Sequence, residues 1–360
     1  MLKSVLLAAA LCLSLGSLTA CKKLLTSDDA DQGSVETLNA ERKSAVAKLR
    51  TIKDPVQEEI YAYRLQVRQA YNERRFDELE TQVAQVRNSK AVFGNGSWKL
   101  VQFYDSLGCR DEEPDSMWTL HDQIHQAWIA AKPDSMAARA AYADFQTEYA
   151  WKARGSGYAN TVTEDGWKLY EERLKAAHRT LKDARKLVEK DPEWWRAALG
   201  VALGEGMPKD AYDKLTAEAV AYEPTFWGFD TTRAYSLLPR WYGAQGDWEA
   251  YADAAAKRPG GLGAETYARV VINLHGYYDN VFHETQASWL LTREGLAQLR
   301  RKYPASVGLL HVSAELAVLA EDRPLAKELF DQIGDGYLPD QWYKPARFVQ
   351  YRQWAQTGHW

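Results

Sequence analysis

The chain lacks a block of basic residues, and this absence restricts its partners. Its 360 residues carry 45 Lys and Arg against 49 Asp and Glu, which gives a net charge of −4. Affinity for nucleic acid comes mostly from neutralised phosphates, so we expect no nucleic-acid binding. Twelve Pro and 23 Gly exclude a collagen-like or low-complexity chain.

Phenylalanine is also scarce, because only 9 Phe stand beside 14 Trp and 20 Tyr. With 46% hydrophobic residues, the chain has enough apolar material for a core, which excludes disorder over most of its length. The surplus of Trp has two interpretations. Large aromatic rings can fill gaps between helices, or they can line a ligand-binding groove.

The first 20 residues have the pattern of a secretory signal peptide. Lys3 supplies the positive charge, and Val5–Leu15 form an apolar run that is shorter than the ~20 residues a membrane span needs. The adjoining segment Leu18-Thr19-Ala20-Cys21 resembles the lipobox of bacterial lipoproteins. This resemblance implies cleavage before Cys21 and lipid attachment to its thiol and new amino group. The alternative is an ordinary signal peptide followed by a coincidental cysteine.

Lys22 and Lys23 follow, without the Asp that commonly retains lipoproteins at the inner membrane. We therefore expect a protein anchored by lipid in the outer membrane and facing the periplasm, with exposure at the cell surface left open. Residues 21–34 read as a flexible polar tether, and residues 35–360 as a single helical-repeat domain.

Cysteine is scarce as well. Cys12 leaves with the signal peptide and Cys21 is consumed by lipid, so Cys109 alone remains and no intrachain disulfide can form. We interpret Cys109 as a small buried apolar group, with a nucleophilic role as the alternative.

Period-two alternation is missing, whereas helical periodicity recurs along the body. Within residues 166–191, apolar residues recur every three or four positions, which predicts one amphipathic helix with a buried stripe. This stripe contains Tyr170, Leu174, Ala177, Leu181, Ala184 and Val188. Ser135 and Thr163 stand where helix N-caps are expected, as do Asp115 or Ser116, and Asp230.

Short polar turns join pairs of these segments, and Pro192 to Pro224 is a step near the 34-residue tetratricopeptide period. Leu199-Gly200 and Ala219 fall where that repeat places its Leu-Gly pair and late Ala. We predict an all-α fold, specifically a tetratricopeptide-like right-handed α-solenoid of degenerate helical hairpins.

Two segments resemble a bacterial family known as domain of unknown function 4034. They are Trp151-Lys152-Ala153-Arg154-Gly155-Ser156-Gly157-Tyr158-Ala159 and Leu237-Leu238-Pro239-Arg240-Trp241-Tyr242-Gly243. The resemblance covers roughly residues 55–298. It implies an all-helical fold and supplies no catalytic residues.

The binding residues that we predict are Trp151, Arg154, Arg240 and Trp241, each beside a break in a helix. An Arg beside an aromatic ring suits a carboxylate or a sugar acid. The alternative is structural, because an Arg near a helix C-terminus can satisfy loop carbonyls.

Other constellations do not predict catalysis. His121 and His125 have the spacing of zinc ligands, but Asp122 stands where zinc proteases carry Glu, and we place both His on the flank of a stripe formed by Leu120, Ile124, Ala127 and Ala131. No Gly-x-Ser-x-Gly motif occurs. We predict no catalytic residue, metal or cofactor.

The leading functional prediction is a non-catalytic, lipid-anchored scaffold in the cell envelope that binds a partner protein or peptide. A glycan or small-ligand binder that uses a Trp/Arg groove is the alternative, and an enzyme acting on envelope polymers is the third.

Overall fold

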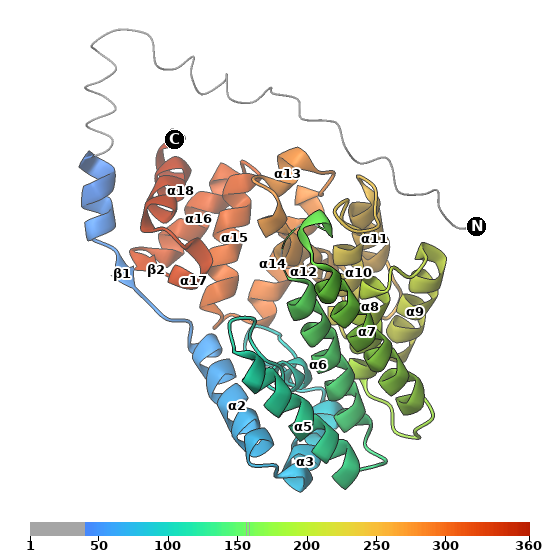
Figure 1. Cartoon of the computed structure of the whole chain (residues 1–360). Coiled ribbons are helices and arrows are strands. Elements are labelled where there is room, and N and C mark those ends of the chain that lie inside the picture. The colour runs from blue at the N-terminus through green and yellow to red at the C-terminus, as the bar shows by residue number, and fades with distance from the viewer. Residues whose placement is uncertain (1–39, 156, 158) are drawn as a thin grey trace.

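Figure 1 shows the computed structural model, which describes residues 40–155, 157 and 159–360. The predicted signal peptide, Cys21 and the tether up to residue 34 lie outside these residues. The described chain is mostly helical, and its strands are only two residues long. The prediction of an all-α fold is therefore confirmed.

A first helical segment covers residues 40–47 and leads into the short strand β1 (Arg50–Thr51). The N-terminal half then contains α2 (Pro55–Asn72), α3 (Phe76–Ser89), α4 (Lys99–Tyr104), α5 (Asp115–Ala131), α6 (Met136–Arg154), the 3₁₀ turn η1 (Ala159–Thr161), α7 (Glu164–Ala184) and α8 (Pro192–Gly204).

The C-terminal half contains α9 (Lys209–Tyr222), α10 (Gly228–Ser236), α11 (Asp247–Ala256), α12 (Ala264–Leu274), the 3₁₀ turn η2 (His275–Tyr277), α13 (Val281–Glu284), α14 (Trp289–Lys302), α15 (Val307–Leu319), α16 (Arg323–Ile333), β2 (Gly336–Tyr337), α17 (Pro339–Trp342) and α18 (Pro345–Thr357).

Local sequence signals explain where several helices begin. The Ser135 side chain accepts a hydrogen bond from Ala138 N, and Thr163 accepts one from Gly166 N, so both predicted caps are confirmed. Two other predicted caps are wrong. The N-cap of α5 is Pro114, and Asp230 lies inside α10, where its carboxylate pairs with Arg258 instead.

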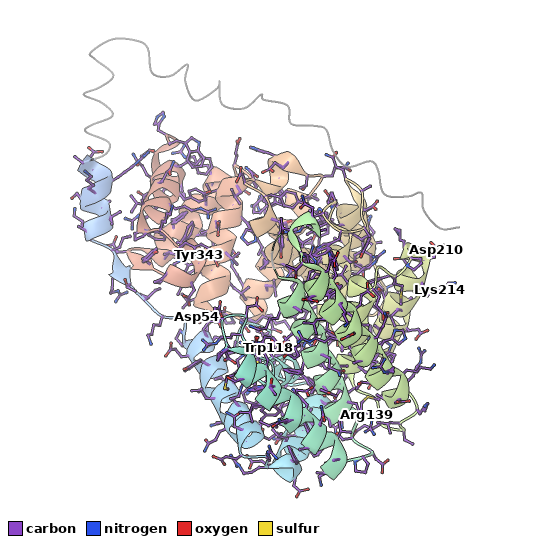
Figure 2. All side chains as sticks on the ribbon, viewed as in Figure 1. Asp54, Trp118, Arg139, Asp210, Lys214 and Tyr343 are labelled. Carbon is purple, nitrogen blue, oxygen red and sulfur yellow. The ribbon has the colours of Figure 1, made fainter. Side chains whose placement is uncertain are left out.

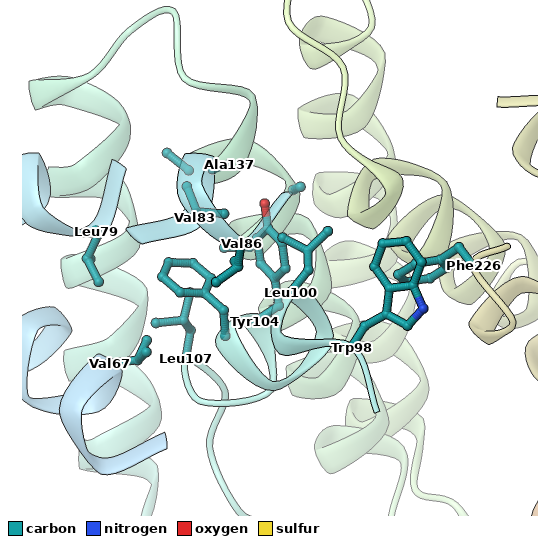
Figure 3. Packing of buried hydrophobic residues seen from close by; sticks show 14 of the residues in the cluster. Val67, Leu79, Val83, Val86, Trp98, Leu100, Tyr104, Leu107, Ala137 and Phe226 are labelled. Atoms are coloured by element: carbon teal, nitrogen blue, oxygen red, sulfur yellow. The ribbon is translucent and has the colours of Figure 1, made fainter. Parts of the chain in front are cut away.

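Helices that follow one another in the chain pack together, as α6 does on α7, α12 on α14 and α15 on α16. Figure 3 shows part of the largest buried cluster, which joins Val67 of α2 and Leu79 of α3 to Tyr104 of α4. Trp98 extends this cluster by an edge-to-face contact with Phe226, whose ring centroid lies 5.0 Å away. Trp118 and Trp128 are fully buried, so these two rings fill space between helices rather than line a groove.

The two ends of the described chain lie side by side (Figure 1). Strands β1 and β2 pair in parallel, with Arg50 opposite Gly336 and Thr51 opposite Tyr337. The Arg42 side chain donates a hydrogen bond to Gln353, and Leu49 packs against the core formed by α15, α16 and α18. The N-terminal segment therefore closes the bundle by covering its last helices.

Asp54 makes a second connection between the two ends. Its buried carboxylate accepts hydrogen bonds from Val56 N at the start of α2 and from Gly308 N at the start of α15, both at 2.9 Å. One carboxylate thus accepts hydrogen bonds from otherwise unpaired backbone N–H groups at two helix N-termini, where the helix dipoles favour negative charge.

Two predicted apolar stripes need correction. In the first, Val188 is 97% exposed because α7 ends at Ala184, whereas the other five predicted residues are buried. In α5 the predicted stripe is rotated, because Leu120 is 40% exposed while His121 and His125 are buried. None of the helices in the described residues is both long enough and apolar enough to cross a membrane.

Candidate functional site

The first pair of predicted binding residues, Trp151 and Arg154, lies at the C-terminal end of α6. The Trp151 ring makes an edge-to-face contact with Tyr170 at 5.0 Å, and the Arg154 guanidinium lies 5.5 Å from the centres of Trp151 and Trp167. Arg154 also donates hydrogen bonds to the carbonyls of Gly155 and Gly157. It therefore closes the loop after α6, as the structural interpretation predicted.

The second pair of predicted binding residues, Arg240 and Trp241, lies in the turn between α10 and α11. Arg240 is exposed, its guanidinium lies 5.5 Å from the Trp241 ring centre and 5.6 Å from that of Tyr277, and no carboxylate pairs with it within the described residues. The buried Nε1 of Trp241 likewise has no hydrogen-bond partner there.

The two pairs are in contact, because the Trp151 and Trp241 ring centroids are 5.6 Å apart in an edge-to-face arrangement. We call Trp151, Arg154, Arg240 and Trp241 the Trp/Arg cluster. The four residues come from two segments that are far apart in the sequence, and the fold brings them into contact. Both rings are partly exposed.

A separate cavity of about 970 Å³ opens where the first and last helices of the described chain approach each other. We call it the polar cavity. Its wall combines the start of α2, the loop before α4, and residues of α12, α15, α17 and α18. The lining residues that the arguments below use are Asp54, Gln57, Trp227, Arg269, His275, Tyr278, Asp279, Glu315, Asp340, Gln341, Tyr343, Arg347 and Tyr351.

Glu315 of α15 is a buried charge of this cavity, with only 2% of its surface exposed. Its carboxylate accepts a hydrogen bond from Gln341 Nε2 at 2.5 Å and pairs with Arg347 Nη2 at 2.7 Å. Burial by itself lowers the pKa of Arg347, but the adjacent Glu315 carboxylate outweighs burial and holds that pKa above its ordinary value.

His275 faces the same carboxylate. Its Nδ1 lies 2.8 Å from the Ile272 carbonyl and donates to it, so in the neutral ring Nε2 is an acceptor. This Nε2 lies 3.9 Å from Glu315 Oε2. In that state two acceptors face each other inside the cavity, and Glu315 Oε2 also accepts the hydrogen bond from Gln341 Nε2.

Tyr343 stands at the cavity in a strained conformation. Its φ of 56° and ψ of −48°, with a 2.5 Å hydrogen bond from Lys344 N to Trp342 O, form the rare γ-turn. A non-glycine residue in this region costs ~1–3 kcal/mol, and such strain is concentrated at ligand clamps and active sites. The side chain is nevertheless 81% exposed. No glycine marks this turn, so the sequence carried no signal for it.

One group of possible metal ligands lies at the start of α5, within the described residues. Ligand atoms of Cys109, Glu113 and His121 lie within 4.8 Å of one another. However, Arg68 Nη1 lies 3.0 Å from His121 Nε2, and His121 Nδ1 lies 3.2 Å from the Leu107 carbonyl. Both ring nitrogens are therefore engaged, and the positive charge of Arg68 lies beside the group and would repel a cation.

Neighbouring groups are also held in their uncharged forms. Burial raises the pKa of Cys109 to about 12, which keeps the thiol protonated and unreactive. Burial, reinforced by His121, lowers the pKa of His125 to about 3, and its neutral ring packs among Tyr71, Tyr142 and Phe145. The two histidines belong to the core rather than to its flank.

A charge network around the fully buried Glu193 lies beside this cluster. Arg196 of α8 pairs with Glu193 at 2.7 Å, Asp144 at 2.8 Å and Asp105 at 3.4 Å. Burial, followed by repulsion from Asp144, raises the pKa of Glu148 to about 8. One arginine thus holds three carboxylates, and Glu148 remains protonated at neutral pH.

No family model matches the chain, and neither the curated proteins nor the solved structures include a match.

Proposed function

We propose that this chain is a non-catalytic binding protein of the bacterial cell envelope, and that its polar cavity holds an extended peptide segment of a partner protein. The observation that carries the proposal is the polar cavity with the strained and exposed Tyr343 beside it. Its volume is near the upper end of the ~300–1,000 Å³ typical of ligand sites.

An extended occupant is favoured by the surface next to the cavity. Gln57 lines the cavity, and Tyr61 and Leu65 follow it at intervals of four residues, so the three side chains share one face of α2. Tyr61 is 63% exposed and Leu65 is 50% exposed. A peptide leaving the cavity along α2 would cover both apolar side chains.

The proposed architecture is a tetratricopeptide-like right-handed α-solenoid of degenerate helical hairpins. Packing between successive helices supports it, as does the burial of Leu199 and Ala219 at the positions expected for repeat residues. In such a fold each hairpin buries its apolar side against the next. Membership in the family called domain of unknown function 4034 is part of this proposal.

The proposed location is the outer membrane, with the body tethered by a lipid on Cys21. A flexible tether covering residues 21–34 would have a root-mean-square reach of about 20 Å. Mass spectrometry of the mature N-terminus tests this step: a diacylated or triacylated Cys21 supports it, and an unmodified N-terminus contradicts it.

Photo-crosslinking in cells tests the cavity proposal. A photoreactive phenylalanine analogue is placed at Tyr343, and a matched control is placed at Lys214 on α9, which lies well away from Tyr343 (Figure 2). We expect Tyr343 to crosslink one continuous segment of a partner protein and Lys214 not to do so. Equal crosslinking at both positions, or none at Tyr343, would contradict the proposal.

The second candidate function is recognition of an anionic glycan at the Trp/Arg cluster. The contact between Trp151 and Trp241, with Arg240 unpaired by any carboxylate among the described residues, favours it. A carboxylate could pair with Arg240 while a sugar ring stacks on the indoles. Titration with glucuronic acid oligomers should quench Trp fluorescence, and the Trp241→Ala variant should lose this response.

A further inference from the structure

The polar cavity carries unbalanced negative charge. Two arginines line it against four carboxylates, namely Arg269 and Arg347 against Asp54, Asp279, Glu315 and Asp340.

Both arginines are already neutralised. Arg347 pairs with Glu315, and Arg269 lies 2.9 Å from Glu265 with its guanidinium 4.6 Å from the Trp227 ring centre. Neither is therefore available as the main partner of an anionic ligand, because binding an anion there would first require breaking an ion pair in a largely buried site.

Two of the four carboxylates remain available. Asp279 and Asp340 are exposed, and neither forms an ion pair or side-chain hydrogen bond within the described residues. Asp54 is different, because its two oxygens already accept from backbone N–H groups. The free negative charge of the cavity therefore comes from Asp279, which precedes α13, and from Asp340 in α17.

A second observation points to a donor. His275 Nε2 and Glu315 Oε2 face each other at 3.9 Å, and a group with several N–H donors can bridge two acceptors at this spacing. An ammonium or guanidinium group does so, and a single hydroxyl offers only one donor. Glu315 is almost fully buried and already pairs with Arg347, so it can add a hydrogen bond to a bound cation while the free negative charge comes from Asp279 and Asp340.

Aromatic rings complete the surroundings expected for a cation. Trp227, Tyr278, Tyr343 and Tyr351 line the cavity, and the negative face of such rings attracts an ammonium or guanidinium group. Arg269 over Trp227 and Arg347 over Tyr351 show that the cavity already holds cations against its rings.

We infer that the polar cavity selects a positively charged group of the bound peptide, an amine or a guanidinium, which the free carboxylates of Asp279 and Asp340 and the surrounding rings recognise. This inference rests on the proposed function for the identity of the ligand as a peptide. The choice of charge depends only on the cavity.

Calorimetric titration of the full-length protein in detergent, at ionic strength of about 0.15 M, tests the inference. The probes are spermidine, a capped Ala-Lys-Ala-Lys-Ala peptide, and the same peptide with acetylated lysines. We expect spermidine to bind and the lysine peptide to bind at least tenfold more tightly than its acetylated form.

The double variant Asp279→Asn, Asp340→Asn should weaken binding of the lysine peptide and of spermidine at least fivefold. Asp210→Asn is the matched control, because Asp210 is an exposed and unpaired carboxylate, within the described residues, on the distant helix α9 (Figure 2). This control should bind like the original chain. Equal losses in both variants would mean that general surface charge attracts the probes, and would overturn the inference.

The outcomes separate the two proposals. If both peptides bind equally well, the inference is overturned and the proposed peptide-binding function stands. If spermidine binds and loses affinity in the double variant while neither peptide binds, the inference stands and the peptide-binding function fails. If neither spermidine nor the lysine peptide binds, the inference is overturned.

Discussion

Asp54 connects α2 to α15, and this connection predicts that the effect of Gly308→Ala on the free energy of unfolding changes sign when Asp54 is replaced. Asp54→Ala removes the cap of α2, which is worth about 0.5–2 kcal/mol. It also leaves Gly308 N without its charged acceptor, at a cost of about 1.5–3 kcal/mol. Chemical denaturation followed by circular dichroism should therefore show a loss of about 2–5 kcal/mol in the free energy of unfolding.

Gly308→Ala is the second substitution of the double-mutant cycle. A Cβ added there would lie 2.9 Å from Asp54 Oδ2, so Gly308→Ala must displace the carboxylate and should destabilise the chain. With Asp54 already replaced by Ala this clash disappears. Ala then has the higher helix propensity, by up to about 1 kcal/mol. Gly308→Ala should consequently destabilise the original chain and stabilise the Asp54→Ala variant.

Asp54→Asn is the matched control. Its side-chain oxygen can still cap α2, but its amide group would present a donor to Gly308 N, so we expect an intermediate loss. The reasoning is refuted if Asp54→Ala changes the free energy of unfolding by less than about 0.5 kcal/mol, the range of ordinary surface substitutions. It is equally refuted if the effect of Gly308→Ala is the same in both backgrounds.

Three further predictions concern charge and strain. Because burial raises the pKa of Glu148 from 4.5 to about 8, the folded chain keeps a proton that the unfolded chain releases, so its stability contribution is lost as pH rises from about 4.5 to about 8. Glu148→Gln should thus raise Tm at pH 8 and leave it unchanged at pH 4, and equal shifts at both values would argue against burial as the cause. Tyr343→Gly should relieve strain and so raise the free energy of unfolding by roughly 1 kcal/mol, while it weakens peptide binding. A lower free energy of unfolding in denaturant titrations would show that the γ-turn is not strained. Arg196→Met leaves the fully buried Glu193 carboxylate without its cation and should lower the free energy of unfolding by about 3 kcal/mol, whereas a neutral effect in thermal melts would contradict this role of Arg196.

The helices were predictable from sequence because their signals are local. Ser135 and Thr163 satisfy nearby N–H groups, and the stripe from Tyr170 to Ala184 repeats with the period of the helix it forms. The same locality explains the error in α5. Apolar periodicity ranks Leu120 above His121, whereas tertiary packing buries the histidine among aromatic rings and Arg68 and leaves the leucine exposed.

The candidate sites were predictable only in part. The four residues of the Trp/Arg cluster stood out as aromatic and cationic neighbours at helix ends, but their contact depends on how α6 packs against the turn after α10. The polar cavity had no local signature at all. It exists because β1 pairs with β2 and Asp54 bonds Gly308, and such long-range contacts leave no periodic pattern in the sequence.

Hydrogen exchange of the full-length protein, with and without a synthetic peptide that copies the segment crosslinked at Tyr343, tests the central claim most directly. The account predicts that the peptide slows exchange in residues 54–65, 272–279 and 339–351, which form or adjoin the polar cavity. Slower exchange confined to residues 151–155 and 240–243, around the Trp/Arg cluster, would contradict it, as would unchanged exchange in the cavity residues when the peptide is saturating.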